Sequence, residues 1–188
     1  MNSGIFLNNT RDLSFPSRII LIGFMGSGKS TVGKLLASTL DYQYVDTDAL
    51  IEKQEAMSVA DIFAKNGEGY FRKLESDVVK SLNGYENIVI ATGGGMPVFE
   101  NNMDFLNQAG ITIFLQVGVQ TIYERISKDK TRPLVTAHTG NSLKAFIKNK
   151  LLERNPFYDR AKVLVAGGRN AKLVVQTILH KIASKKQH

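Results

Sequence analysis

The hydrophobic positions of this chain alternate between short apolar runs and longer stretches in which apolar residues recur every three or four positions. The short runs cover residues 19–22, 42–45, 88–91, 111–117 and 163–166. Runs of this length are typical of buried strands, while the longer stretches have the period of amphipathic helices. Because strands and helices alternate, the pattern predicts an α/β fold with a parallel sheet that is covered by helices on both faces.

The stretches between these runs predict the helices. We expect helices at residues 29–40, 49–56, 58–67, 71–82, 119–128, 142–158 and 171–184, and one that follows Pro97 and stops at Gly110. Ser58 and Asp61 have the spacing of a capping box, so they are expected to begin the helix that Gly67 ends. A chain of 188 residues with this pattern is most simply a single domain.

Two segments depart from the alternation. Residues 1–17 have neither a basic start nor a long apolar centre, so we interpret them as an N-terminal extension and not as a signal peptide. The domain then covers residues 18–188. Residues from about 128 to 142 are polar and basic and contain Arg132 followed by proline. Such weakly packed segments often cover active sites, so we expect a lid there.

Composition narrows the classes of protein. The apolar fraction of 43% is that of a globular chain, and the absence of cysteine excludes disulfides and thiolate metal sites and suits a reducing cytoplasm. No uninterrupted apolar stretch approaches the roughly 18 residues that span a bilayer. The 24 Lys and Arg exceed the 17 Asp and Glu, which gives a formal net charge of +7. These cations are scattered, without interleaved aromatic residues, so we expect small anionic ligands and no nucleic acid or membrane.

The strongest chemical signal follows the first apolar run, residues 19–22. Gly23, Gly28, Lys29 and Ser30 fill the spacing G-x-x-x-x-G-K-[ST] of a phosphate-binding loop. Its glycines let successive N–H groups turn toward a polyphosphate, and the helix that begins there directs its positive dipole end at the same anion. The alternative is a glycine-rich turn with an ordinary surface lysine. The strand before the loop and the helix after it favour the phosphate loop.

Two aspartates follow the second strand. Asp46 and Asp48 are two positions apart, so both side chains can reach one cleft at the end of the strand. One carboxylate suits Mg²⁺ beside Ser30, and the other suits an acceptor hydroxyl during phosphoryl transfer. The alternative is a solvated turn or a helix cap. The third strand runs into Thr92 without the acid that phosphate-loop enzymes usually place there, so Asp46 is the predicted substitute.

A glycine triplet and three arginines complete the set. The triplet at 93–95 lets the backbone approach a ligand closely, although it also suits a tight turn into the next helix. Arg72 shares a helix face with Glu75, which indicates either a guanidinium held for a substrate carboxylate or a surface ion pair. Arg132 and Arg154 lie in the predicted lid and just beyond it, and each alone is more typical of a surface residue.

Together these segments resemble the shikimate kinase family. The matching segments are Gly-Phe-Met-Gly-Ser-Gly-Lys-Ser-Thr (23–31), Asp-Thr-Asp (46–48), Phe-Arg-Lys-Leu-Glu (71–75), Thr-Gly-Gly-Gly (92–95), Arg-Pro-Leu (132–134) and Arg-Asn-Pro-Phe-Tyr (154–158). They occur in the family's order and with compatible spacing over roughly residues 18–185. The phosphate loop alone marks only a nucleotide-binding protein, whereas the whole set is specific.

The resemblance implies a fold like that of the nucleoside monophosphate kinases, with a five-stranded parallel sheet in the order 2-3-1-4-5. It implies a monomeric cytoplasmic enzyme that uses ATP and Mg²⁺ to phosphorylate the 3-hydroxyl of shikimate. The implied ATP-binding residues are Gly26, Ser27, Gly28, Lys29, Ser30 and Thr31, with Ser30 and Asp46 on the metal. The implied shikimate-binding residues are Asp48, Arg72, Gly94, Gly95 and Arg154, with Asp48 as the base. Lys29 and Arg132 are implied to neutralise the transferred phosphoryl group.

Two points are left open by the sequence. The family's loop for the nucleotide base matches poorly, and Arg169 is the candidate there. A gluconate kinase of the same fold also needs a phosphate loop and a carboxylate-binding site, but the Phe-Arg-x-x-Glu and Thr-Gly-Gly-Gly segments argue against it. A nucleic-acid module that uses the positive charge would instead require a contiguous basic surface.

Overall fold

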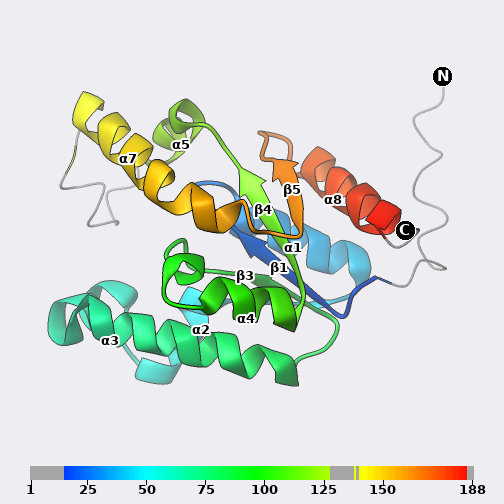
Figure 1. Ribbon diagram of the computed structural model, residues 1–188, viewed down its shortest axis with the longest axis horizontal. Coiled ribbons are helices and arrows are strands. Elements are labelled where there is room, and N and C mark those ends of the chain that lie inside the picture. Colours follow the sequence, from blue (N-terminus) through cyan, green and yellow to red (C-terminus); the bar gives the residue numbers. More distant parts are fainter. Residues whose placement is uncertain (1–14, 128–137, 139, 186–188) are drawn as a thin grey trace.

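Five strands form one parallel sheet in the computed structural model, which describes residues 15–127, 138 and 140–185. The strands are β1 (Arg18–Ile22), β2 (Gln43–Asp46), β3 (Ile88–Ala91), β4 (Ile111–Gln116) and β5 (Val163–Ala166). Their order across the sheet is β2-β3-β1-β4-β5, and every pairing is parallel (Figure 1). The predicted fold class and strand order are therefore confirmed.

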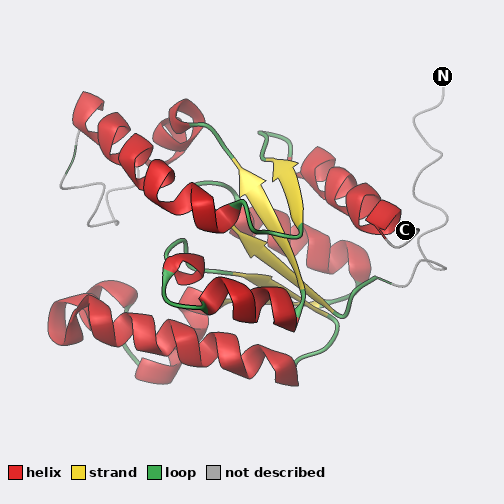
Figure 2. Cartoon of the chain, viewed as in Figure 1, coloured by secondary structure: helices red, strands yellow, loops and turns green. Residues whose placement is uncertain are grey.

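Helices cover both faces of the sheet (Figures 1 and 2). The α-helices are α1 (Lys29–Leu40), α2 (Thr47–Glu55), α3 (Val59–Ser81), α4 (Asn102–Ala109), α5 (Val119–Ile126), α7 (Gly140–Tyr158) and α8 (Ala171–Lys185). The short 3₁₀ helices are η2 (Leu82–Gly84) and η3 (Met96–Val98). One apolar core joins the sheet to α2, α3, α4, α5 and α7, and a second joins its other face to α1 and α8.

The burial of the strands follows their place in the sheet. Ile19, Ile20, Leu21 and Ile22 of the central β1 are fully buried. In contrast, β5 at the edge alternates between buried and exposed residues, and its Leu164 is 39% exposed. Helix α8 covers one face of this edge strand, while Leu164 is partly exposed on the other.

Two of the predicted helix boundaries need correction. The helices expected at 58–67 and 71–82 are one element, α3, with a kink where Gly67 takes a φ of 81° and a ψ of 168°. The Ser58 side chain caps this helix as predicted, because its Oγ accepts from the Asp61 N–H. The helix expected directly after Pro97 is also wrong, since the chain first makes the 3₁₀ turn η3 and α4 begins only at Asn102.

The segments that carry the predicted site residues follow β1 and β2 and lead to opposite faces of the sheet. The segment after β1 leads into α1, and the segment after β2 leads into α2, on the opposite faces of the sheet (Figure 1). Most of the predicted lid and residues 1–14 of the predicted extension lie outside the described residues. No helix in the described part of the chain is long and apolar enough to cross a membrane.

Candidate active site

The phosphate loop connects β1 to α1 and has the backbone that the motif predicts. Gly23, Gly26 and Gly28 have φ values of 140°, 73° and 98°, in the region that side chains disfavour. The buried Lys29 ammonium donates to the Gly23 carbonyl at 2.7 Å and to the Phe24 carbonyl at 2.9 Å. Because α1 begins at Lys29, the N–H groups of its first turn and the Lys29 ammonium lie at the same place, as a polyphosphate requires.

Two oxygen ligands suited to Mg²⁺ meet at the start of α1. The Ser30 hydroxyl donates to the Asp46 carboxylate, with 3.1 Å between Oγ and Oδ2. The Tyr44 hydroxyl donates to the same Oδ2 at 3.2 Å. Burial and the neighbouring Asp46 raise the pKa of Tyr44 to about 12, so its hydroxyl remains a donor. A hydroxyl and a carboxylate beside a phosphate loop fit a magnesium ion, which binds few protein carboxylates when it also binds phosphate.

Asp46 also caps α2, which is the helix-cap role that the sequence left open as an alternative. Its Oδ1 accepts from the Asp48 N–H at 3.1 Å, while its Oδ2 faces Ser30. The cap fixes the first turn of α2, which contains Asp48. The two aspartates therefore differ in role: Asp46 points toward the phosphate loop, and Asp48 points toward the glycine triplet.

Asp48 and Glu75 converge on Gly93. A Cβ atom on Gly93 would lie 2.5 Å from Asp48 Oδ1 and 2.8 Å from Glu75 Oε1, so only glycine leaves room for both carboxyl groups. Glu75 is 0% exposed, and its Oε1 has no hydrogen-bond partner among the described residues. Burial raises the pKa of Glu75 to about 7 in spite of the attraction of the Arg72 guanidinium.

Arg72 lies against the other end of the triplet. Its Nη1 is 2.5 Å from Glu75 Oε2, and its Nη2 is 2.7 Å from Glu68 Oε1 on the preceding turn of α3. A Cβ atom on Gly95 would collide with the Arg72 guanidinium. The side chain of Arg72 is 14% exposed, so the guanidinium is held by two carboxylates at the wall of the site. The Arg72–Glu75 pair is therefore mostly buried and is not the surface ion pair that was the alternative.

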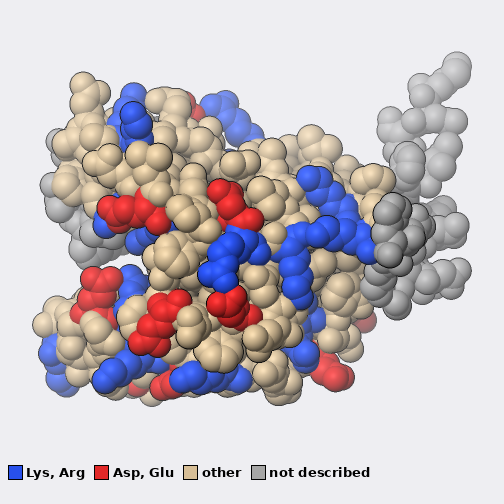
Figure 3. All heavy atoms as spheres, viewed as in Figure 1, with Lys and Arg blue, Asp and Glu red and all other residues tan. Residues whose placement is uncertain are grey.

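Arg154 reaches the triplet from α7. Its guanidinium lies over the ring of Phe24 in the phosphate loop, 5.3 Å from the ring centroid. A Cβ atom on Gly94 would be 3.4 Å from Arg154 Nη1. In the space-filling view, acidic and basic side chains gather where the part that contains α7 meets the part that contains α3 (Figure 3). The structure therefore brings Arg154 to Gly94 and Arg72 to Gly95, two neighbouring residues of the same triplet.

The nucleotide end of the loop borders a cavity of about 280 Å³ between the phosphate loop and the turn after β5. Ser27, Gly28, Thr31 and Arg169 line this cavity, as does Arg125, which the sequence analysis missed. Arg125 donates to the Gly26 carbonyl and to the Gly168 carbonyl, both at 2.8 Å, and so joins the two loops. No motif marks Arg125. Its place at the end of α5 indicates it only once the fold is known.

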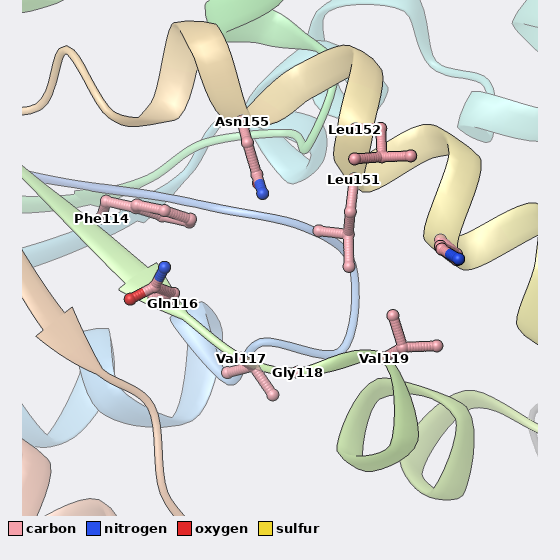
Figure 4. A pocket seen from close by; sticks show the side chains of 9 residues that line it. Phe114, Gln116, Val117, Gly118, Val119, Leu151, Leu152 and Asn155 are labelled. Carbon is pink, nitrogen blue, oxygen red and sulfur yellow. The ribbon is translucent and has the colours of Figure 1, made fainter.

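A larger cavity of about 470 Å³ lies between the end of β4 and the middle of α7 (Figure 4). Phe114 and Gln116 border it from β4, and Leu151 and Asn155 border it from α7. None of the predicted site residues lines this cavity.

Arg132, which the sequence predicts at the phosphates, lies outside the described residues. Within the described part, most of the predicted residues lie near the carboxyl ends of β1, β2 and β3, while Arg154 comes from α7 and Arg169 from the turn after β5.

Comparison with known proteins agrees with this geometry. The family model described as shikimate kinase matches residues 25–183. A shikimate kinase of Aquifex aeolicus is 42% identical over 162 residues, which cover 86% of this chain and 94% of the relative. One of Parabacteroides distasonis is 38% identical over 168 residues, which cover 89% and 95%.

Solved structures add two further comparisons. The shikimate kinase of Acinetobacter baumannii in complex with shikimate has a TM-score of 0.83 and 34% identity, with 92% of this chain and 96% of that chain covered. A gluconokinase from Sinorhizobium meliloti has a TM-score of 0.59 and 18% identity, with coverage of 92% and 94%. At that identity the gluconokinase shares the fold alone.

Proposed function

The chain belongs to the shikimate kinase family, and we propose the residues by which it performs the family's reaction. It is a kinase that uses ATP with Mg²⁺ to phosphorylate shikimate at the 3-hydroxyl, yielding shikimate 3-phosphate and ADP, a step of aromatic amino acid biosynthesis. The observation that supports the site is the convergence of Asp48, Arg72 and Arg154 on one glycine triplet beside the phosphate loop.

On the acceptor side, the two arginines bind the carboxylate of shikimate. A guanidinium presents a planar fork that suits a carboxylate, and Glu75 holds the fork of Arg72 in place. The N–H groups of Gly94 and Gly95 bind the substrate from the backbone. Asp48 binds the hydroxyls, orients the 3-hydroxyl toward ATP and accepts its proton during transfer.

On the donor side, residues 26–31 hold the phosphates through backbone N–H groups and the Lys29 ammonium. Ser30 and Asp46 would hold Mg²⁺, which would supply positive charge at the transferred phosphate. Arg132 adds a further positive charge at the phosphoryl group from the lid at about 128–142. Phosphoryl transfer depends mainly on positioning and charge neutralisation, which these groups provide.

The base and ribose of ATP occupy the cavity between the phosphate loop and the turn after β5. Arg125 and Arg169 both line it, but their settings differ. Arg125 is fixed by two backbone carbonyls, whereas the Arg169 side chain is 86% exposed and pairs with Glu124 at 3.0 Å. We therefore assign Arg125 the larger share of nucleotide binding and Arg169 a smaller one.

We also propose that residues 18–188 act as one monomeric, cytoplasmic domain that does not bind nucleic acid, with residues 1–17 as an extension outside it. The basic side chains at the amino ends of the strands support this. Arg18, Lys162 and Lys185 each donate to main-chain carbonyls, which gives them a structural role. Over α3, acidic side chains lie among the basic ones on the face seen in Figure 3.

The test is a coupled ADP-release assay with ATP, Mg²⁺ and a panel of acids that includes shikimate and gluconate. We expect ADP to form when shikimate is present and not with the other acids. A lack of shikimate-dependent ADP formation, with activity on gluconate or none at all, would contradict the proposed function.

A further inference from the structure

The three peptides of the glycine triplet are held in different ways. The Gly93 N–H donates to the buried Thr47 hydroxyl at 2.9 Å, and the Gly93 carbonyl accepts from the Met96 N–H at 3.2 Å. The Gly94 carbonyl accepts instead from a distant side chain, because the Tyr158 hydroxyl of α7 donates to it at 2.5 Å. The peptide between Thr92 and Gly93 is therefore held by a side chain of α2, whereas the peptide between Gly94 and Gly95 is held by a side chain of α7.

A trans peptide directs its N–H and its C=O in opposite directions, and the structure has no cis peptide among its described residues. The Tyr158 hydroxyl that holds the Gly94 carbonyl therefore also sets the direction of the Gly95 N–H. That N–H points away from Tyr158. Gly95 itself lies directly against the Arg72 guanidinium. The orientation of one proposed substrate donor is thus decided by a residue that no sequence motif assigned to the site.

Tyr158 is well fixed for this task. It is 0% exposed, and its ring packs against Phe114 with 5.1 Å between the centroids. Burial raises the pKa of Tyr158, so the hydroxyl keeps its proton and remains a donor. The Arg154 guanidinium, one turn earlier on α7, lies near the same hydroxyl and opposes the effect of burial on its pKa. The Tyr158 hydroxyl and the Arg154 guanidinium thus meet at Gly94, since a Cβ atom there would be 3.4 Å from Arg154 Nη1.

We propose that Tyr158 is a positioning residue for the acceptor, which couples the Arg154 guanidinium to the peptide that presents the Gly95 N–H. The proposal rests on the proposed function for its effect on catalysis. The coupling itself is a property of the protein without substrate. When a carboxylate draws Arg154 toward it, the linked Tyr158 hydroxyl keeps the Gly95 N–H in the direction that the same substrate needs. The two contacts then strengthen each other.

The direct test is the amide resonance of Gly95 in ligand-free protein labelled with ¹⁵N-glycine. Tyr158→Phe keeps the ring and removes only the hydroxyl, so it is expected to shift the Gly95 amide. Tyr42→Phe is the matched control, because the Tyr42 hydroxyl also donates to a main-chain carbonyl, that of Phe15 at 3.4 Å, away from the site. A Gly95 amide that moves equally in both variants, or in neither, would overturn the proposal.

Arg154→Lys gives a second measurement that does not depend on how well Tyr158→Phe folds. It keeps a positive charge but loses the guanidinium that lies beside Gly94 and Tyr158, so it also is expected to shift the Gly95 amide without substrate. An unchanged Gly95 amide in a folded Arg154→Lys protein would show that the two groups are not coupled.

The kinetic readout separates positioning from a general loss of structure. We expect Tyr158→Phe to lower kcat/KM for shikimate about tenfold and to leave the KM for ATP within about twofold, since one buried hydrogen bond is lost. Equal changes for both substrates would indicate a merely structural role and count against the proposal. If no variant or wild-type protein acts on shikimate while the Gly95 amide still shifts, the coupling stands and the proposed function fails.

Discussion

The two halves of the proposed site differ in which parts of the protein form them. The nucleotide half comprises residues 23–31, Arg125 and Arg169. The acceptor half comprises Asp48, Arg72, Glu75, residues 93–95 and Arg154. The nucleotide half is mostly the backbone of one continuous loop, with its cation supplied from the same loop. The acceptor half gathers side chains from α2, α3 and α7 around a turn after β3.

The two halves also differ in how deeply their charged side chains are buried. In the acceptor half, the fully buried Glu75 pairs with Arg72, whose side chain is 14% exposed and also pairs with Glu68. In the nucleotide half, Arg169 and Glu124 form their ion pair in solvent. Buried charges lose much more than exposed ones when a partner is removed. Substitutions in the acceptor half are therefore expected to have the larger effects.

The largest effect is expected at Asp48. Asp48→Asn removes the carboxylate that orients and deprotonates the hydroxyl, so kcat is expected to fall by about 10²–10⁴-fold. Steady-state ADP release under saturating ATP and shikimate measures this change. The matched control is Asp77→Asn, which changes an exposed carboxylate of α3 that pairs with Lys80. A near-normal kcat for Asp48→Asn would remove Asp48 from that role.

The next effect is expected at Arg154. Arg154→Ala leaves the substrate carboxylate without one of its two cations, and shikimate binding is expected to weaken by about 2–5 kcal/mol. Calorimetric titration with shikimate measures the loss directly. Arg160→Ala serves as control, because Arg160 pairs with Asp104 on the exposed surface. Shikimate affinity that stays the same in Arg154→Ala would contradict the carboxylate contact.

A smaller effect, on the pH dependence of stability, is expected from Glu75, the buried carboxyl group of the acceptor half. Because the pKa of Glu75 is raised from 4.5 to about 7, the folded protein binds more protons than the unfolded chain between these values. Its contribution to the free energy of unfolding therefore falls by on the order of 2 kcal/mol as the pH rises from 5 to 8.

Glu75→Gln removes this dependence while it keeps the shape of the side chain. Chemical unfolding at several pH values is expected to show Glu75→Gln gaining stability relative to the wild type as the pH rises. A difference between the two proteins that stays constant from pH 5 to pH 8 would contradict the raised pKa.

The smallest effect is expected in the nucleotide half. Arg125→Ala removes the donors to the Gly26 and Gly168 carbonyls, so the KM for ATP is expected to rise about tenfold with little change in the KM for shikimate. Arg169→Ala is the comparison within the same cavity and is expected to change the KM for ATP by less than about threefold, since its ion pair is exposed. If Arg169→Ala had the larger effect, the assignment of the two arginines would be reversed.

The same difference explains how much the sequence could predict. The phosphate loop is contiguous, and its spacing alone predicted the backbone that the structure has. The strand order and the places of Asp46, Asp48 and the triplet also followed from the alternating pattern and the family resemblance. The break at Gly67 was predicted, but its continuation into a single kinked helix was not, because packing of α3 on the core decides it.

The rest depends on contacts between residues far apart in the chain. Glu75 was seen only as a partner of Arg72, since its approach to Asp48 across Gly93 requires the fold. Arg125 belongs to no motif and acquires its role from the carbonyls of two other loops. Tyr158 lay inside a matched segment, yet its bond to Gly94 joins positions 64 residues apart. No local pattern indicates such pairs.

In the proposed reaction, the acceptor half presents a single hydroxyl of shikimate to ATP. The most direct measurement is proton–phosphorus correlation NMR of the product formed from ATP, Mg²⁺ and shikimate. We predict one phosphorus resonance that couples to the proton on carbon 3, together with a stoichiometric amount of ADP. Phosphate on another hydroxyl, or inorganic phosphate alone, would contradict the proposed reaction.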